Sequence, residues 1–291
     1  MKTSLALIAA GMFTASVYAL PDYDPFADAT GSGGTAYIVG DPLIGQQDAL
    51  GQIWVQAGPV NATQPKIVAG NLTYSGLPAS QGNSVSFGGT GESARLNLSS
   101  TAASGTLYYS FIMNVSSAPS AGSGGIFWAG FNNSAGSQST TPTTIASRVY
   151  AKGFGSTFQL GTSKSSSTAS DWVFDSTTRN VGDTVFVVGS YTFNSATASD
   201  DVASMWINPT VIYGQSVPTP TLTTSSGPDI TLNQISSFLL MDRNASQLGG
   251  TMDELRIGTT WADVTIPEPS TMTLAGFGML ALGAWYRTRR R

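Results

Sequence analysis

The sequence contains neither cysteine nor histidine. Without cysteine, the chain cannot form a disulfide, a thiolate metal site or a cysteine nucleophile. Without histidine, it lacks Ser-His-Asp catalysis, histidine-based zinc sites and the usual general base near neutral pH. The stability of the fold must therefore come from packing, and bound ions are the one further source of stability that the composition leaves open.

Charge is also scarce. Charged residues make up 10% of the chain, against about 25% in an average soluble domain. The formal net charge is −4, and 16 of the 17 acidic residues but only 8 of the 13 basic ones lie between Leu20 and Ile266. An acidic body does not attract phosphates, so we expect no nucleic-acid partner. Solubility explains the acidity, and an acidic binding surface is the alternative.

Residues 1–19 have the pattern of a secretory signal peptide. Lys2 supplies a short positive region, and an apolar stretch covers residues 5–13. Val17 and Ala19 are small residues that suit cleavage between Ala19 and Leu20. An apolar first strand or helix is the alternative. The pattern predicts an N-terminal signal helix and an exported protein.

The other end of the chain carries a second apolar segment. Two prolines interrupt regular structure at residues 266–270, an uncharged run covers 271–286, and an arginine-rich segment covers 287–291. Sixteen helical residues span roughly 24 Å, slightly short of a ~30 Å hydrocarbon core. Trp285 and Tyr286 suit the membrane interface, and the arginines suit the cytoplasmic side. We expect a transmembrane helix that anchors the chain in the inner membrane with the large domain outside.

This segment resembles the PEP-CTERM sorting signal, in which a Pro-Glu-Pro motif precedes a short hydrophobic helix and a basic terminus. Pro267, Glu268 and Pro269 supply the motif. The resemblance implies passage through the secretion machinery, recognition by a membrane-embedded exosortase, cleavage near the motif, and a bacterium with two membranes that exports polysaccharide. Another enzyme would recognise these three residues as its substrate, so they are not catalytic in this chain. A plain membrane anchor is the alternative.

Residues 20–265 have the pattern of one all-β domain. Alternating or β-branched runs predict strands at 107–115, 184–193, 202–208, 235–241 and 252–257. Turns rich in Gly, Ser, Asn and Asp separate them, and no stretch before residue 266 keeps a helical period. We expect a single sandwich domain at 20–265, between the signal peptide at 1–19 and the sorting and anchor segment at 266–291.

Several short pieces of this body resemble the laminin-G-like jelly rolls of the concanavalin A-like superfamily. They lie at positions 37–58, 109–113, 187–194, 204–209 and 252–258, with Trp261 after them. The resemblance implies an antiparallel jelly-roll β-sandwich with a concave face. In that superfamily, the face often binds glycan, sometimes with calcium nearby.

The acids do not have the spacing of a glycanase. Retaining glycosidases need two carboxylates about 5–5.5 Å apart, and glycanases of this superfamily carry them as Glu-x-Asp-x-Glu on one strand. Glu92, Glu254 and Glu268 are the only glutamates, and none begins such a motif. Asp253 and Glu254 are adjacent, so we expect one to pair near the closing strand and the other to be solvated. We expect Arg256 to pair with an acid.

Candidates for binding remain. Trp128, Trp172 and Tyr150 are possible glycan contacts, with burial as the alternative for Trp128. We expect the other strand tryptophans, Trp54, Trp206 and Trp261, to lie in the core. Calcium is the one cofactor considered: Asp200 and Asp201, or the early acids Asp22, Asp24 and Asp28, could offer oxygen ligands, and solvated loop acids are the alternative.

The sequence thus predicts an exported, exosortase-sorted protein of the cell surface or extracellular matrix, without catalytic activity and with exopolysaccharide as its ligand. Two alternatives stay open. One is a glycan-active hydrolase or lyase on a concanavalin A-like fold. The other is a purely structural surface protein.

Overall fold

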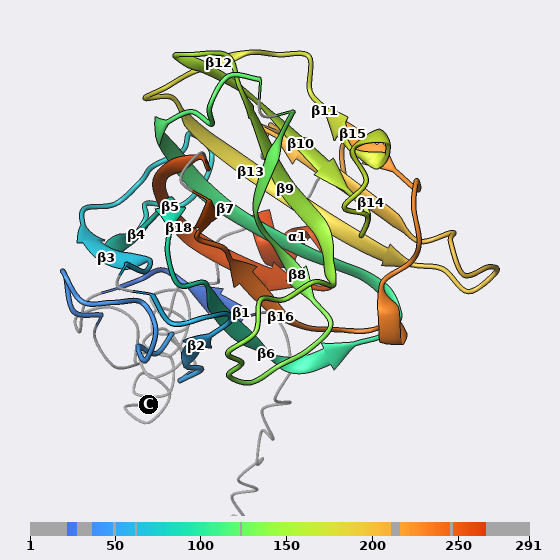
Figure 1. Cartoon of the computed structure of the whole chain (residues 1–291), viewed down its shortest axis with the longest axis horizontal. Coiled ribbons are helices and arrows are strands. Elements are labelled where there is room, and N and C mark those ends of the chain that lie inside the picture. The colour runs from blue at the N-terminus through green and yellow to red at the C-terminus, as the bar shows by residue number, and fades with distance from the viewer. Residues whose placement is uncertain are drawn as a thin grey trace, which may run out of the picture.

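The computed structural model describes residues 22–27, 37–48, 51–61, 63–122, 124–210, 216–244 and 247–265. Two antiparallel eight-stranded sheets pack face to face, and two short strands, β5 (Gly89–Thr90) and β17 (Arg243–Asn244), form a separate pair (Figure 1). The predicted all-β, antiparallel two-sheet sandwich is confirmed. The predicted signal helix and transmembrane helix lie outside the described residues.

The first sheet joins early and late parts of the chain, because β18 lies between β7 and β4. A short strand, β1 (Asp22–Asp24), also pairs with β18. The spatial order is β15 (Leu222–Thr224), β14 (Val202–Ile207), β13 (Thr184–Phe193), β7 (Gly105–Ser117), β18 (Gly249–Gly258), β4 (Asn83–Phe87) and β3 (Lys66–Ala69).

The second sheet is built around a run of three consecutive strands, β8, β9 and β10. A two-residue strand, β12 (Arg179–Asn180), pairs with β10 beside β11. The spatial order is β11 (Val173–Phe174), β10 (Thr157–Ser163), β9 (Ile145–Gly153), β8 (Ile126–Asn132), β16 (Ile235–Leu240), β6 (Ala94–Ala102) and β2 (Trp54–Gln56).

The main core lies between the two sheets. Alternate residues of β7, from Leu107 to Val115, are fully buried against inward-facing residues of the second sheet, such as Phe131 and Phe238. Trp54 is buried in the same core, as predicted. The predicted strand at 107–115 therefore lies within β7, with its apolar face toward the second sheet.

Gly189 makes room for a contact that crosses the core. It pairs with Tyr109 on the neighbouring strand, and a Cβ at this glycine would lie 2.0 Å from Cζ of the tyrosine. The tyrosine hydroxyl donates a 2.9 Å hydrogen bond to the carbonyl of Ser147, on β9 of the opposite sheet. The absence of a side chain at residue 189 therefore lets one tyrosine tie the two sheets together.

The outer face of the first sheet is also covered. Phe186 and Val188 of β13 are buried there with Trp206 and with the short helix α1 (Trp261–Thr265). The hydroxyl of Ser110 on β7 donates a 2.6 Å hydrogen bond to the carbonyl of Val264. This cover explains why β13 carries apolar residues on both faces.

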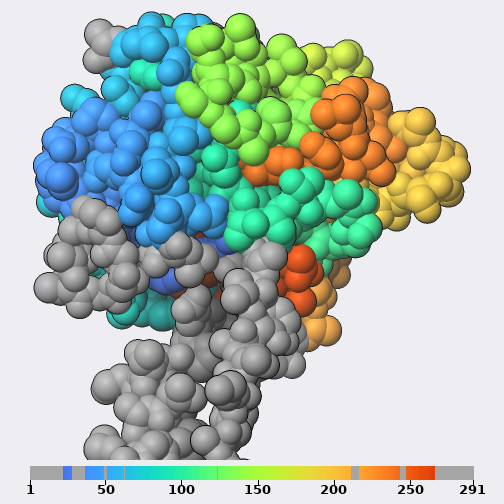
Figure 2. Space-filling view, turned by 90° about the horizontal axis from the view of Figure 1, so that it is seen from below, coloured from blue at the N-terminus to red at the C-terminus, as the bar shows by residue number. Residues whose placement is uncertain are grey.

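The outer face of the second sheet is partly covered by the 133–144 loop. Arg95 on β6 is fully buried, and its guanidinium donates to Gly136 O (2.8 Å), Asn132 Oδ1 (2.8 Å) and Gln138 Oε1 (2.7 Å). Figure 2 shows this loop, in light green, beside the blue segment that holds Gly58, and the Gly58 amide donates to the carbonyl of Gln138 (2.9 Å). The buried arginine therefore helps to hold the loop on the sheet, together with bonds such as the one from the Ser237 hydroxyl to the carbonyl of Ser134 (2.7 Å).

Candidate functional site

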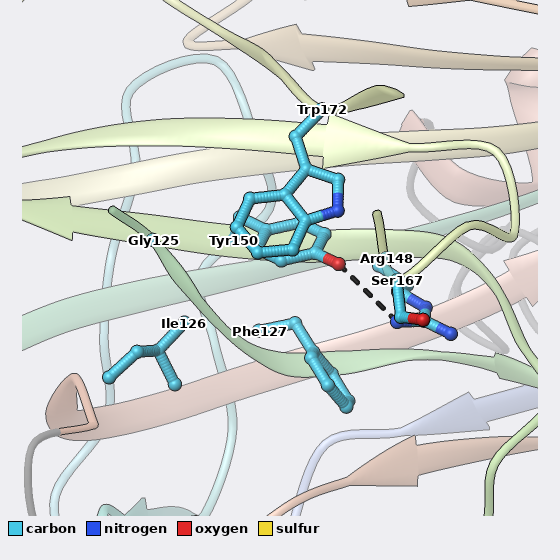
Figure 3. Close-up of a pocket in the computed structure, with 7 residues that line it drawn as sticks. All are labelled: Gly125, Ile126, Phe127, Arg148, Tyr150, Ser167 and Trp172. Carbon is cyan, nitrogen blue, oxygen red and sulfur yellow. Dashed lines mark hydrogen bonds between the residues drawn. The ribbon is translucent and has the colours of Figure 1, made fainter. Parts of the chain in front are cut away.

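A surface hollow of about 250 Å³ opens on the outer face of the second sheet, beyond the 133–144 loop (Figure 3). Its floor comes from β9 and from the start of β8, and its rim comes from the connection between β10 and β11. The lining residues are Gly125, Ile126, Phe127, Arg148, Tyr150, Ser167 and Trp172. We call this set the aromatic hollow.

Strand periodicity places the two floor residues together. Arg148 and Tyr150 are two positions apart on β9, so their side chains share the outer face. Directly across from Tyr150, on β10, stands Gly161, and a Cβ there would lie 2.5 Å from the ring of Phe174. The glycine thus gives Phe174 room to pack against Tyr150, with ring centroids 6.2 Å apart.

Aromatic rings form the apolar part of the hollow. The Trp172 and Tyr150 rings lie 4.4 Å apart between centroids with a 32° tilt, and the Phe127 ring meets Tyr150 edge-on at 5.8 Å. Tyr150 is 1% exposed, whereas Trp172 and Phe127 are half-buried. The Trp172 indole N–H donates a 3.3 Å hydrogen bond to the carbonyl of Ser166, which fixes the indole over the floor.

The polar part of the hollow lies at the hydroxyl end of Tyr150. Figure 3 shows this hydroxyl pointing toward the guanidinium of Arg148, whose Nη1 donates to it over 3.3 Å. The guanidinium carbon also lies 4.8 Å from the centroid of the Phe127 ring, a cation–π contact. The hollow therefore combines ring faces with one cation, and none of its lining residues is an acid.

The structure brings together two of the three predicted glycan contacts. Trp172 and Tyr150 form the aromatic hollow, but Trp128 points into the core, where it is fully buried and stacks on Phe87 with centroids 4.3 Å apart. Adjacent β8 residues face opposite ways, so Phe127 reaches the hollow and Trp128 does not. Sequence reasoning missed Phe127 and Arg148. The position of Phe127 directly before Trp128, on the opposite face of a strand, was the signal for the first, and nothing in the sequence marked the second.

The predicted calcium candidates Asp200 and Asp201 lie close to a third acid, Asp229. The three offer carboxylate oxygens within 4.8 Å of one another. The ammonium of Lys164, which is fully buried, lies 2.8 Å from Asp229 Oδ1, and Asp201 accepts hydrogen bonds from the Tyr191 hydroxyl (2.7 Å) and the Asn194 amide (2.6 Å). A lysine therefore already supplies the positive charge beside this cluster.

The early acids are also engaged in the fold. Asp24 is fully buried and accepts hydrogen bonds from the hydroxyl of Tyr37 (2.5 Å) and the indole of Trp54 (2.7 Å). Burial raises the pKa of Asp24 to about 6. Asp22 is 1% exposed and accepts a bond from the Ser99 amide (3.2 Å), and Asp28 lies outside the described residues. These contacts give Asp22 and Asp24 structural roles.

Asp253 and Glu254 differ from the expectation that one of them is solvated, because both are buried. Glu254 has a φ of 56° at an irregularity in the pairing of β18 with β7, which turns its side chain toward Arg256 (2.7 Å) and the Tyr23 hydroxyl (2.8 Å). Asp253 accepts from the amides of Leu72 and Glu254, both at 2.8 Å. The prediction that Arg256 pairs with an acid agrees with this contact.

The predicted processing residues, Ala19 and Leu20 at one end and Pro267, Glu268 and Pro269 at the other, lie outside the described residues, as does the predicted span at 271–286. Within the part of the chain that the structure describes, no helix has the length and apolar character needed to cross a membrane.

Comparison with known proteins gives a family match for the end of the chain and fold likenesses for the body. The PEP-CTERM protein-sorting motif matches residues 265–291. No curated protein matches the sequence. Similar solved structures include domain 4 of AbnA, an extracellular arabinanase from Geobacillus stearothermophilus, in complex with arabinotriose. It is 13% identical over 71% of this chain and 82% of that one, with a TM-score of 0.40.

Two further likenesses come from other classes of protein. The endo-β-1,4-glucuronan lyase of Trichoderma reesei is 11% identical over 73% of this chain and 97% of its own, with a TM-score of 0.40. The globular domain of T. cruzi calreticulin is 10% identical over 71% and 84%, with a TM-score of 0.41. This chain therefore joins an antiparallel two-sheet β-sandwich to a PEP-CTERM sorting motif, which implies export and exosortase-mediated sorting to the cell surface.

Proposed function

We propose that the chain is a noncatalytic surface or matrix protein that binds a saccharide of the exported polysaccharide in the aromatic hollow. The observation that carries the proposal is the pairing of Tyr150 and Trp172 on an open part of the second sheet. Sugar rings present apolar C–H faces, and aromatic side chains give such faces a large contact area with polar groups at the edge.

The size of the hollow fits a small unit of a longer chain. Pockets for drug-sized ligands run from about 300 Å³ upward and bury most of the ligand. The hollow holds about 250 Å³ and opens to solvent, so it suits one ring of a polymer that continues on both sides. Binding through one unit is weak for a single site, and many copies on a surface would hold a polymer by multivalency.

The residue types of the hollow favour binding over turnover. Glycoside hydrolysis needs two carboxyl groups flanking the bond, and no lining residue is an acid. The chain also contains no histidine to act as a base. A lyase that uses a tyrosine hydroxyl is the enzyme alternative, with Tyr150 beside Arg148 as its only support.

The chain would reach the surface by way of the inner membrane. The chain would be held in the inner membrane through residues 271–286, cleaved near Pro267, Glu268 and Pro269 by an exosortase, and then released to the cell surface or the matrix. Intact mass and location in the host test this step. Wild type should lose the segment and leave the membrane, whereas a variant with the three motif residues changed to alanine should stay full-length in the membrane.

Retention on the host's own exported polysaccharide tests the binding part. The protein should be retained, and no unsaturated or reducing ends should accumulate during prolonged incubation. Release of such ends would replace the binding role with an enzymatic one. Neither retention nor release, together with loss of surface organisation on deletion, would favour the purely structural alternative.

A further inference from the structure

Arg148 brings a buried positive charge to the wall of the aromatic hollow without a carboxylate to balance it. The residue is 3% exposed. Its guanidinium donates only to neutral oxygens: the carbonyls of Ile145 (3.0 Å), Ser165 (3.0 Å) and Thr143 (3.4 Å) and the Tyr150 hydroxyl (3.3 Å). Among the described side chains, no acid forms an ion pair with it. Buried charges are usually paired, so this one lacks its expected partner.

The hydrogen bonds also leave the guanidinium with donor capacity toward the hollow. An arginine has five N–H groups, and the contacts just described are four in number. The only bond from Nη1 is the 3.3 Å contact with the Tyr150 hydroxyl, which is long for a donor that carries a full charge. A carboxylate in the hollow would be a stronger acceptor for this nitrogen than a phenol.

The charges around the hollow favour an anion. Lys152 lies on the same face of β9, with its ammonium 5.9 Å from the centroid of the Phe174 ring, which packs on Tyr150. Among the nearby acids, Asp175 is paired with Arg179 at 2.5 Å, and Asp171 precedes Trp172 without lining the hollow. Arg148 is therefore the one charged residue that lines the hollow, Lys152 adds a second cation nearby, and no lining residue is an acid.

Arg95 shows what a purely structural arginine looks like on this same sheet. It also donates to neutral oxygens, but those belong to the 133–144 loop and to Asn132 just before it, and Arg95 itself is fully buried. Arg148 differs because it lines an open space beside ring faces. A ligand can reach the second arginine and cannot reach the first.

We propose that the aromatic hollow selects an acidic saccharide unit, with the sugar face against the half-buried rings of Trp172 and Phe127 and the carboxylate toward Arg148. This inference rests on the proposed saccharide binding and names its ligand class. The negative charge of the domain as a whole opposes a polyanion at long range. Binding must therefore depend on short-range contact with Arg148, which salt screens less than the long-range repulsion because this arginine is buried.

The test compares two probes of different charge on the same sugar backbone: trigalacturonate and its fully methyl-esterified form, in which each carboxylate carries a methyl group. Each is titrated calorimetrically into the protein purified from its host, at 50 and 500 mM NaCl. We expect the acid to bind about tenfold or more tightly than the ester, and this difference to persist at high salt because the contact with Arg148 is short-range and buried. Arg148→Lys, which keeps the charge but loses the fork of donors, should reduce the difference. Lys66→Gln, which removes a charge from an exposed position of the other sheet, should not.

The outcomes separate the two proposals. If acid and ester bind equally, the hollow binds saccharides without selecting charge, and the inference about Arg148 is wrong while the proposed function stands. If neither probe binds and the host polysaccharide is not retained either, both are wrong. Because the comparison of probes uses the wild-type protein, it remains decisive even if Arg148→Lys fails to fold.

Discussion

The indole of Trp172 lies against the phenol ring of Tyr150, which is buried beneath it, with centroids 4.4 Å apart. Tyr150 belongs to β9 and Trp172 to the connection after β10, so the pair forms only when the second sheet is assembled. The floor ring is rigidly packed and the covering ring is half-buried. Substitution of the covering ring should therefore change binding much more than stability.

We expect Trp172→Ala to weaken retention on the host polysaccharide about five- to tenfold, because one stacking face is lost. Thermal denaturation should change little. Phe154→Ala is a matched control, since this ring is 47% exposed and lies outside the hollow. Equal retention of wild type and Trp172→Ala would exclude the aromatic hollow as the binding site.

The buried ammonium of Lys164 makes a second prediction about the acidic cluster. Replacement by methionine keeps much of the side-chain volume but leaves Asp229 facing Asp200 and Asp201 without their cation. We expect a loss of about 3–5 kcal/mol in the free energy of unfolding, measured by denaturant titration. Lys66→Met is the exposed control and should change it by less than about 0.5 kcal/mol.

The same arrangement predicts how the wild-type protein responds to calcium. Because Lys164 already pairs with Asp229 and hydrogen bonds hold Asp201, millimolar CaCl₂ or EDTA should leave the Tm unchanged. A saturable rise of Tm with calcium would contradict this and would restore Asp200 and Asp201 as metal ligands.

Three buried acids should make stability depend on pH. Burial raises the pKa of Asp253 to about 8 and those of Asp24 and Asp242 to about 6, above the value of about 3.9 in an unfolded chain. Since the folded state favours the protonated acids, their contribution is fully present below about pH 4 and is lost as pH rises through 6 and 8. The Tm should therefore fall between pH 4 and pH 8.

Asp253→Asn isolates the upper part of that profile. The amide is neutral at every pH and can still accept one backbone hydrogen bond, so the decline of Tm between pH 6 and pH 8 should flatten. Asp41→Asn, at an exposed position, should give a curve parallel to wild type. If Asp253→Asn also runs parallel, the aspartate titrates near its ordinary pKa.

Gly189 gives a prediction about the link between the two sheets. A methyl group at residue 189 would overlap the ring of Tyr109, so Gly189→Ala should destabilise the fold by about 1–3 kcal/mol. Tyr109→Phe loses only the bond to Ser147 and should cost about 1 kcal/mol. The tyrosine hydroxyl would lie 2.2 Å from the added carbon, so it is part of the clash. The double variant should therefore lose less free energy of unfolding than the sum of the losses in the two single variants.

The strands predicted from the sequence are those with strong local signals. Runs such as 184–193 combine β-branched and aromatic residues, and they became central strands of the first sheet. Strands β6 and β10 were missed because serine, threonine and glycine interrupt their apolar alternation, as in Thr157–Ser163. Their place is set by pairing with neighbours, which no short window of sequence contains.

The aromatic hollow was predictable only in part. Trp172 and Tyr150 stood out as aromatic residues beside polar ones, but the same reasoning selected Trp128, whose direction depends on the register of β8 against β9. Arg148 could not be predicted for a different reason. Its proposed role depends on the lack of a carboxylate near its guanidinium in the folded protein, and the sequence does not show which side chains become neighbours. Which acids are buried, such as Asp253, likewise depends on the cover supplied by segment 70–82.

Helix α1 ends where the sorting motif begins. Val264 and Thr265 are buried against the first sheet, and Pro267 follows only two residues later, so at most ~7 Å of extended chain separates it from the packed body. An exosortase that cleaves at the motif must therefore bind its substrate almost in contact with the folded sandwich, because so few residues separate the two. Every strand and core residue that the structure describes lies before the motif, so a protein shed by cleavage there should keep the thermal stability of its membrane-held precursor.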